Sequence, residues 1–201
     1  MTKEQALEKI NELQSYIESL DIPFDEAAFK SLEMAHFTRC ENPFSIAKYP
    51  VTNELWDTVM GEKSGVGNLP KVNVSWNDAQ EFIQKLNQIT GKAYRLPTEY
   101  EWVLAATIDN TIYSGSDILY EVGWANDNLQ PVGQKKPNSL GIYDMSGNVW
   151  EWCQNWYDEN KKYRVLRGGS WVNYPQFCRC SYRHCYRPEG RSNAIGFRLV
   201  L

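Results

Sequence analysis

The stretch NSLGIYDMSGNVWEWCQNW, residues 138–156, carries three of the chain's eight tryptophans close together at its end. Tryptophan and tyrosine are both unusually frequent, with eight and twelve residues among 201. Their rings combine a large apolar area with a polar handle, which suits a core as well as a contact surface. We expect Trp150 of this stretch and Trp171 further on to be buried, so that alanine at either position would badly weaken the domain.

The length and composition are those of one globular domain, or of one domain with a small appendage. A 201-residue chain can bury roughly 70% of the surface that its unfolded form exposes, so it needs neither a metal nor a disulfide to fold. The apolar fraction of 42% and the charged fraction of 23% are ordinary for such a protein.

The cysteines and the N-terminal sequence indicate in which cellular compartment the protein is expected. There are five cysteines, an odd number, and three of them lie between residues 178 and 185, which does not predict a disulfide framework. The opening MTKEQALEKI has no apolar region typical of a secretory signal, and no run approaches the ~20 apolar residues of a membrane span. The chain as given is expected in the cytoplasm or a phage particle, or at a surface if a leader has been removed.

The basic residues are concentrated at the C-terminal end. Residues 161–201 hold two lysines and seven of the nine arginines, against the single acid Glu189. Such a tail can bind nucleic acid, especially with aromatic residues between the arginines. The favoured alternative is that Arg179, Arg183 and Arg191 pair with carboxylates of the body, for example Glu101 or Glu151. Nucleic acid is therefore not the expected partner.

Helical patterns dominate the N-terminal half. Residues 3–20 show a short heptad seam at Ala6, Ile10, Leu13, Ile17 and Leu20, which predicts an amphipathic helix that either packs on the body or self-associates. A second short helix is expected at 25–34. Helices are also predicted at 75–92, with Ser75 as the N-cap and Gly91 as the terminator, and at 95–107, with a capping box of Thr98 and Glu101.

Strands are expected at 44–53, 163–169 and 195–201, and the long stretch 108–140 is rich in turns without clear periodicity. Taken with NSLGIYDMSGNVWEWCQNW, five motifs in fixed order resemble the formylglycine-generating enzyme domain, also called the sulfatase-modifying-factor domain: YPVTNELW (49–56), VSWNDAQEF (74–82), RLPTEYEW (95–102), RGGSW (167–171) and GFR (196–198). The resemblance covers residues 40–201. It implies an α+β, C-type-lectin-like fold with a small twisted antiparallel sheet, few helices and long loops, preceded by a helical extension at 1–39.

The enzymes of this family oxidise a substrate cysteine with two cysteines, five residues apart, that bind copper(I). Soft thiolates suit that ion. Counted from RGGSW, the two positions fall on Asn173 and Cys178, and Asn173 cannot supply a thiolate. Cys180 and Cys185 are also five apart, but in a shifted register. We therefore expect no enzymatic activity, with a cysteine-oxidising enzyme as the alternative. A branch with a histidine-rich iron site is not expected, because His36 and His184 are the only histidines.

The tail resembles the variable region of the target proteins of diversity-generating retroelements, found in phages and bacterial chromosomes. In those systems asparagine codons are altered through the adenines of a template copy, and a lectin-like scaffold displays the altered side chains. The resemblance implies 167–201 as the variable region, with fourteen candidate ligand-binding residues that show no helical or strand periodicity and whose types are all reachable from an asparagine codon: Val172, Asn173, Tyr174, Phe177, Cys180, Tyr182, His184, Cys185, Tyr186, Arg187, Gly190, Ser192, Asn193 and Ala194.

This set is suited to binding. Tyr174, Tyr182 and Tyr186 offer rigid, amphipathic contact area at low entropic cost, and Phe177 and Arg187 can act as anchors. The predicted function is non-catalytic binding of an unknown protein or glycan ligand, on a cell surface for instance. A further alternative is an assembly protein of the same fold that associates through residues 3–20.

Two metal sites, one for zinc and one for calcium, can be compared with the sequence. Cys178, Cys180 and Cys185 lack the ligand spacings of a structural zinc site. The family resemblance implies a structural calcium ion, bound by Glu151 and the backbone carbonyls of Gly147 and Val149, although calcium wants six to eight oxygens. The alternative is that Glu151 pairs with a tail arginine. No other cofactor is expected.

Overall fold

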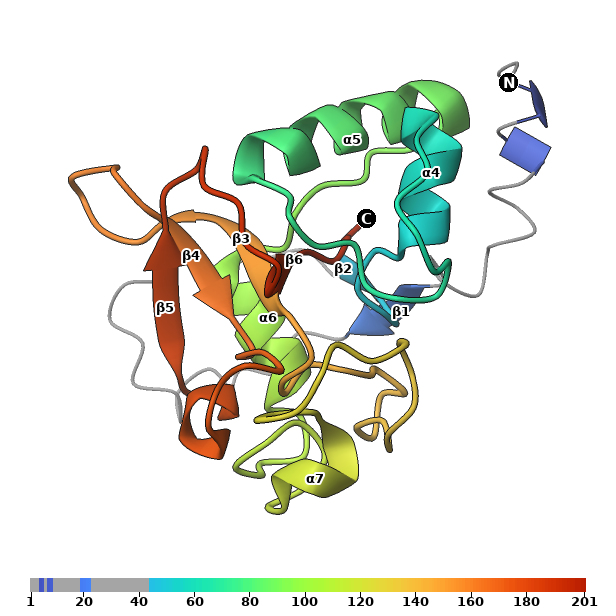
Figure 1. Ribbon diagram of the computed structural model, residues 1–201. Helices are drawn as coiled ribbons and strands as arrows, with labels where there is room; N and C mark the ends of the chain where they lie inside the picture. The colour runs from blue at the N-terminus through green and yellow to red at the C-terminus, as the bar shows by residue number, and fades with distance from the viewer. Residues whose placement is uncertain (1–3, 6, 9–18, 23–43) are drawn as a thin grey trace.

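The computed structural model describes residues 4–5, 7–8, 19–22 and 44–201 (Figure 1). The helix predicted at 3–20 is borne out only at its start, where residues 4–5 and 7–8 are helical. Ser19 and Leu20 instead belong to a strand, β1 (Ser19–Ile22), which pairs antiparallel with β2 (Phe44–Ala47). At Ser19 and Leu20 the backbone pairs with β2 and does not continue the helix. The helix predicted at 25–34 and most of the heptad seam lie outside the described residues.

The main sheet has four strands in the order β5-β4-β3-β6. They are β3 (Trp150–Trp156), β4 (Arg164–Arg167), β5 (Arg183–Tyr186) and β6 (Ile195–Gly196). The first three pair antiparallel, whereas β6 runs parallel to β3, so the sheet is mixed and not purely antiparallel as predicted. The α+β class is confirmed. The N-terminal segment is more than a helical extension, since β1 pairs with a strand of the domain.

The helices begin where the sequence supplies caps. In α5 (Trp76–Thr90) Ser75 and Asp78 form a capping box and Gly91 ends the helix in a left-handed conformation. In α6 (Glu99–Ala106) Thr98 and Glu101 do the same at the start. The helix α4 (Asn53–Met60) was not predicted, nor was the short α7 (Leu119–Val122) inside the long loop. A 3-10 turn, η1 (Pro175–Cys178), lies in the tail.

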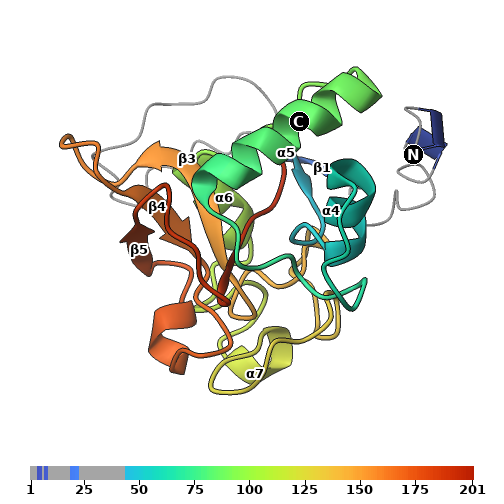
Figure 2. The same cartoon turned by 45° about the horizontal axis from the view of Figure 1, so that its top comes forward.

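The sheet is covered on both faces (Figures 1 and 2). On one side α4 and α5 pack together over a cluster that includes Trp152 and Leu166. On the other, α6 packs against β3 and β4 over a cluster that includes Cys153 and Val165. Among the described residues, no helix is long and apolar enough to cross a membrane.

Candidate functional site

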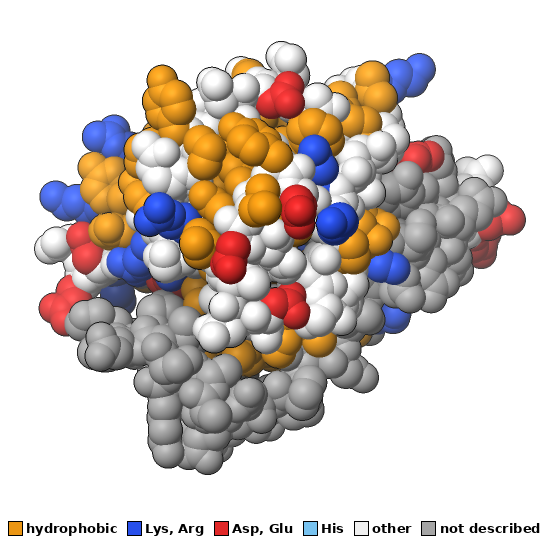
Figure 3. All heavy atoms as spheres, turned by 90° about the horizontal axis from the view of Figure 1, so that it is seen from below, with side chains coloured by type: hydrophobic (Ala, Val, Ile, Leu, Met, Phe, Trp, Pro, Cys, Tyr) orange, Lys and Arg blue, Asp and Glu red, His pale blue; other side chains and the backbone are white. Residues whose placement is uncertain are grey.

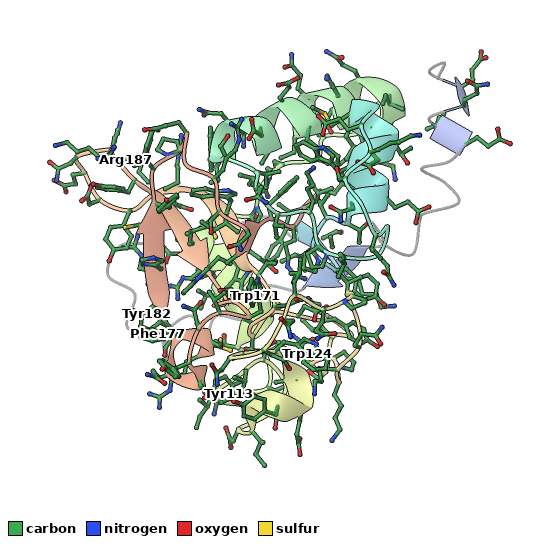
Figure 4. All side chains as sticks on the ribbon, in the orientation of Figure 1. Tyr113, Trp124, Trp171, Phe177, Tyr182 and Arg187 are labelled. Atoms are coloured by element: carbon green, nitrogen blue, oxygen red, sulfur yellow. The ribbon has the colours of Figure 1, made fainter. Side chains whose placement is uncertain are left out.

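The C-terminal tail leaves β4, forms η1, returns as the edge strand β5 and then crosses the molecule to β6 (Figure 1). It exposes six of the fourteen candidate side chains and half-buries six others. The exposed six are Val172, Tyr174, His184, Tyr186, Arg187 and Asn193; the half-buried six are Asn173, Phe177, Tyr182, Cys185, Gly190 and Ser192. Phe177 and Tyr182 lie together at the lower end of β5, and Arg187 lies beyond its upper end (Figure 4).

Two candidates do not belong to this surface. Cys180 is buried against α6, where its thiol donates a hydrogen bond to the carbonyl of Ala106 at 3.4 Å. Ala194 is buried just before β6, and its carbonyl accepts a hydrogen bond from the backbone N–H of Trp150. Both were predicted as ligand-binding residues because they fit the family's pattern. The structure buries both of them, apart from the exposed candidate side chains.

Three candidates on or next to β5 share one face with Trp150 and Trp152 of β3. Since β5 alternates between its two faces, Tyr182, His184 and Tyr186 point the same way. The ring of Trp150 lies 6.1 Å from that of Tyr182 and 5.2 Å from that of His184. Phe177 meets Tyr182 edge-on at 5.1 Å. This aromatic row is strand-like, contrary to the expectation that the candidates have no periodicity, and burial lowers the pKa of His184.

Backbone contacts hold the tail in place. Arg167, itself buried, donates hydrogen bonds from Nη1 to the carbonyls of Cys180 and Tyr182. The N–H groups of Asn126 and Asp127 donate to the carbonyls of Asn173 and Trp171, and that of Asn73 donates to Ser192. In each of these contacts the acceptor is a backbone carbonyl of the tail. The path of the tail therefore depends little on which side chains it carries.

Four arginines of the tail form ion pairs with carboxylates of the body. Arg167 and Arg183 share Glu99, Arg191 pairs with Asp78, and Arg198 pairs with Glu151 in the interior. The expectation of internal pairing is thus confirmed for Arg183 and Arg191, although their partners Glu99 and Asp78 were not foreseen. It is wrong for Arg179, which forms no ion pair with any described residue. Glu99 was missed because the sequence separates it from Arg183 by 84 residues.

The surface continues onto the lower end of the molecule, formed by η1, α7 and the loops around them. Seen from below, this end carries many hydrophobic side chains with charged ones between them (Figure 3). Ile118 and Tyr120, from the long loop, are more than half exposed there. Val172 and Tyr174 are similarly exposed beside η1. The long loop therefore adds apolar area that sequence reasoning assigned to the tail alone.

The residues at the family's copper positions do not fit that ion. Asn173 has no thiol, and its Oδ1 accepts a hydrogen bond from the Ser170 hydroxyl at 2.6 Å. Cys178 is fully buried, and burial raises the pKa of its thiol to about 12. A neutral thiol beside an amide is a poor ligand pair for copper(I). Within the described part of the chain, no three His, Cys, Asp or Glu side chains are arranged to hold a metal.

The carboxylate of Glu151, predicted as a calcium ligand, is bound instead by side chains of the protein. Both carboxylate oxygens of Glu151 accept hydrogen bonds at 2.7 Å from Arg198, and Oε2 also accepts one from Trp102 Nε1. With its oxygens engaged in this way, Glu151 does not fit the set proposed with Gly147 and Val149. The alternative, a pair between Glu151 and a tail arginine, is what the structure shows.

Asp144, in the same turn, is a buried carboxylate that sequence reasoning missed. Its Oδ2 accepts a hydrogen bond from the N–H of Gly133, but Oδ1 has no partner among the described residues. Burial raises the pKa of Asp144 from 3.8 to about 6, against the opposing effects of Gly133 and Arg198. The folded protein therefore binds this proton more tightly than the unfolded chain does.

We expect Asp144→Asn to stabilise the protein in a pH-dependent way. Because the folded pKa is raised, the stability that Asp144 supports is complete below about pH 4 and falls as pH rises to about 6. Asparagine keeps an acceptor for Gly133 and tolerates the left-handed backbone (φ 59°). In urea unfolding the advantage of the variant should grow from near zero at pH 4 to on the order of 2–3 kcal/mol at pH 7. An advantage that is constant with pH would contradict this.

A small mixed sheet with long loops and an anchored, aromatic tail defines a C-type-lectin-like domain. The chain belongs to the family described as the sulfatase-modifying factor enzyme 1-like domain, which matches residues 24–201. The match begins before residue 40, the predicted boundary.

Two relatives and one solved structure illustrate the range of this family. Chaperone protein LppX of Paenibacillus barcinonensis is 30% identical, covering 78% of this chain and 79% of that protein. The formylglycine-generating enzyme of Streptomyces coelicolor is 32% identical, covering 71% of this chain but 57% of the enzyme. The structure of Treponema denticola variable protein 1 is similar with a TM-score of 0.75 and 28% identity, over 79% of this chain and 84% of that one.

Proposed function

We propose that this protein is a non-catalytic binding protein whose tail, residues 167–201, displays a diversified surface to a protein or glycan ligand. The observation that carries the proposal is the way the tail is anchored. Arg167 and the N–H groups of Asn73, Asn126 and Asp127 hold its main chain. A backbone fixed in this way can keep its path while its exposed side chains change.

The chemistry of the exposed side chains supports binding. Tyrosine, phenylalanine and histidine offer large contact area with few rotatable bonds, and they are typical of antibody-like surfaces. The similarity to Treponema denticola variable protein 1 supports a display role over a large part of both chains. Four of the six arginines in residues 167–201 form ion pairs with carboxylates, which argues against nucleic acid as the ligand.

The alternative function is the oxidation of a substrate cysteine, as the similarity to formylglycine-generating enzymes suggests. Asn173 and the buried, neutral Cys178 argue against it. The assembly role through residues 3–20 stays a prediction, since most of that segment lies outside the described residues.

The DNA around the gene tests diversification directly. We expect a reverse-transcriptase gene close by, with a near-copy of codons 167–201 that differs from them only at adenines of the copy. If neither the gene nor the near-copy is present, the tail is not diversified by this route and the proposal fails in that respect.

Exchanging the six exposed side chains together should leave the fold intact. We expect a variant with serine or threonine at Val172, Tyr174, His184, Tyr186, Arg187 and Asn193 to lose less than about 3 kcal/mol of unfolding free energy, the scale of one large core truncation. The reason is that these side chains cover the surface without holding the backbone.

The matched control is Ala194→Tyr, which places a ring at a buried candidate position. This single change should cost more than the six exposed changes together, because a packed interior cannot accept the added volume. Urea unfolding of the two variants gives the comparison. A six-residue variant that unfolds while the control stays folded would contradict the assignment of exposed and buried positions.

A further inference from the structure

A pocket of about 430 Å³ opens between the end of α6 and the segment that joins η1 to β5. This volume is typical of pockets that bind small molecules. It lies on the α6 side of the sheet, away from the aromatic row that packs near Trp150. Its described lining is Val103, Thr107, Thr111, Ile112, Arg167, Arg179, Cys180 and Ser181.

The tail side of the pocket is fixed by three hydrogen bonds at one residue, Cys180. Its N–H donates to the carbonyl of Ile112, its thiol donates to the carbonyl of Ala106, and its carbonyl accepts from Arg167. These contacts tie the tail to the turn after α6. The pocket therefore does not depend on the exposed candidate side chains.

The charge behind the pocket is not balanced. Glu99 is the one carboxylate shared by two guanidinium groups, those of Arg167 and Arg183. Arg183 is one third exposed, so water can solvate it, whereas only 2% of the Arg167 side chain is exposed. Because Glu99 neutralises only one of these two positive charges, an anion near the pocket is favoured.

The mouth of the pocket adds a second cation. Arg179 is exposed and makes no ion pair with any described residue. None of the described lining residues is acidic. The carboxylate of Asp109, which accepts a hydrogen bond from the N–H of Ser139, is close enough to influence Cys180 and partly offsets this positive charge.

We propose that this pocket binds a small organic carboxylate. Arg179 and the hydroxyl of Ser181 would hold the carboxylate, with Arg167 supplying positive potential from behind. Val103 and Ile112 would contact the apolar body of the ligand. The proposal goes beyond ligand display by the tail, and it holds whether or not the tail is diversified.

Matched acids and amides test the proposal in calorimetric titrations with the whole protein. Benzoate and hexanoate should bind, with dissociation constants in the millimolar range typical of small fragments, and benzamide and hexanamide should bind at least tenfold more weakly. Arg179→Gln should weaken benzoate binding at least tenfold. The control Lys63→Gln, at an exposed lysine in the loop after α4 that is not among the described lining residues, should change it less than twofold.

Three results would overturn the proposal: no binding of either acid, equal binding of acids and amides, or an equal loss of benzoate binding in Arg179→Gln and Lys63→Gln. A second variant, Ile112→Trp, narrows the mouth at a half-exposed position and should weaken both acids. A short peptide that ends in phenylalanine distinguishes the sources of the carboxylate. Tighter binding than benzoate, lost on amidation of its C-terminus, would assign the site to a chain end of a protein, and weaker binding to a free acid.

Discussion

Glu151→Gln is expected to lower the free energy of unfolding by about 3–5 kcal/mol, because it leaves a buried guanidinium without its counter-ion. Neither Glu151 nor Arg198 has any exposed side-chain surface. Arg198 also donates to the carbonyls of Ala47 and Tyr143, so it cannot move out to water without breaking these bonds. Urea unfolding at pH 7 measures the loss.

The control for this change is Glu81→Gln, the same substitution in an exposed pair with Lys85 on α5. An exposed ion pair of this kind is worth less than about 1 kcal/mol. If the two glutamine variants lost equal stability, the interior pair would not be the link between the C-terminal end and the sheet that the structure indicates. Such a result would reopen Glu151 as a candidate calcium ligand.

Trp152→Ala should cost about 3–5 kcal/mol, since it removes a fully buried ring from the centre of the sheet. The indole lies in the cluster beneath α5, and its Nε1 donates to the carbonyl of Val74 at 3.1 Å. The truncation leaves a cavity and an acceptor without its partner. Loss of stability in urea is again the measurement.

Trp171→Ala serves as the matched control in the tail. The sequence predicted Trp171 to be buried like Trp150, but the structure leaves it half-exposed, with Nε1 donating to the carbonyl of Asn193 at 3.2 Å. Its truncation should cost less than half as much as that of Trp152. The assignment of the core would be wrong if Trp171→Ala proved the more damaging change.

Features that depend on neighbours in the sequence were predictable. The caps of α5 and α6 are hydrogen bonds between residues that lie three apart in the sequence. They could therefore be predicted from the sequence alone, as Ser75 with Asp78 and as Thr98 with Glu101. The β4 strand and the long loop after α6 were predictable for the same reason. The ordered motifs also indicated the family and its fold class.

The central strand β3 escaped prediction because both of its faces are covered. Its first four residues, from Trp150 to Cys153, are all buried, so the strand lacks the alternation that marks a half-exposed strand. The short edge strand β5 was not predicted because its four residues, RHCY, show no alternation of apolar and polar types. Its position follows only from pairing with β4.

By itself the sequence determined the fold class, the starts of α5 and α6, the absence of a cysteine at position 173 and the excess of arginine in the tail. Only the tertiary structure decided which carboxylates those arginines meet, that Cys180 and Ala194 are buried, and that Glu151 faces Arg198. The physical reason is distance along the chain. A cap closes over three residues, whereas the pair of Glu99 with Arg183 forms only after the sheet has brought together residues 84 apart.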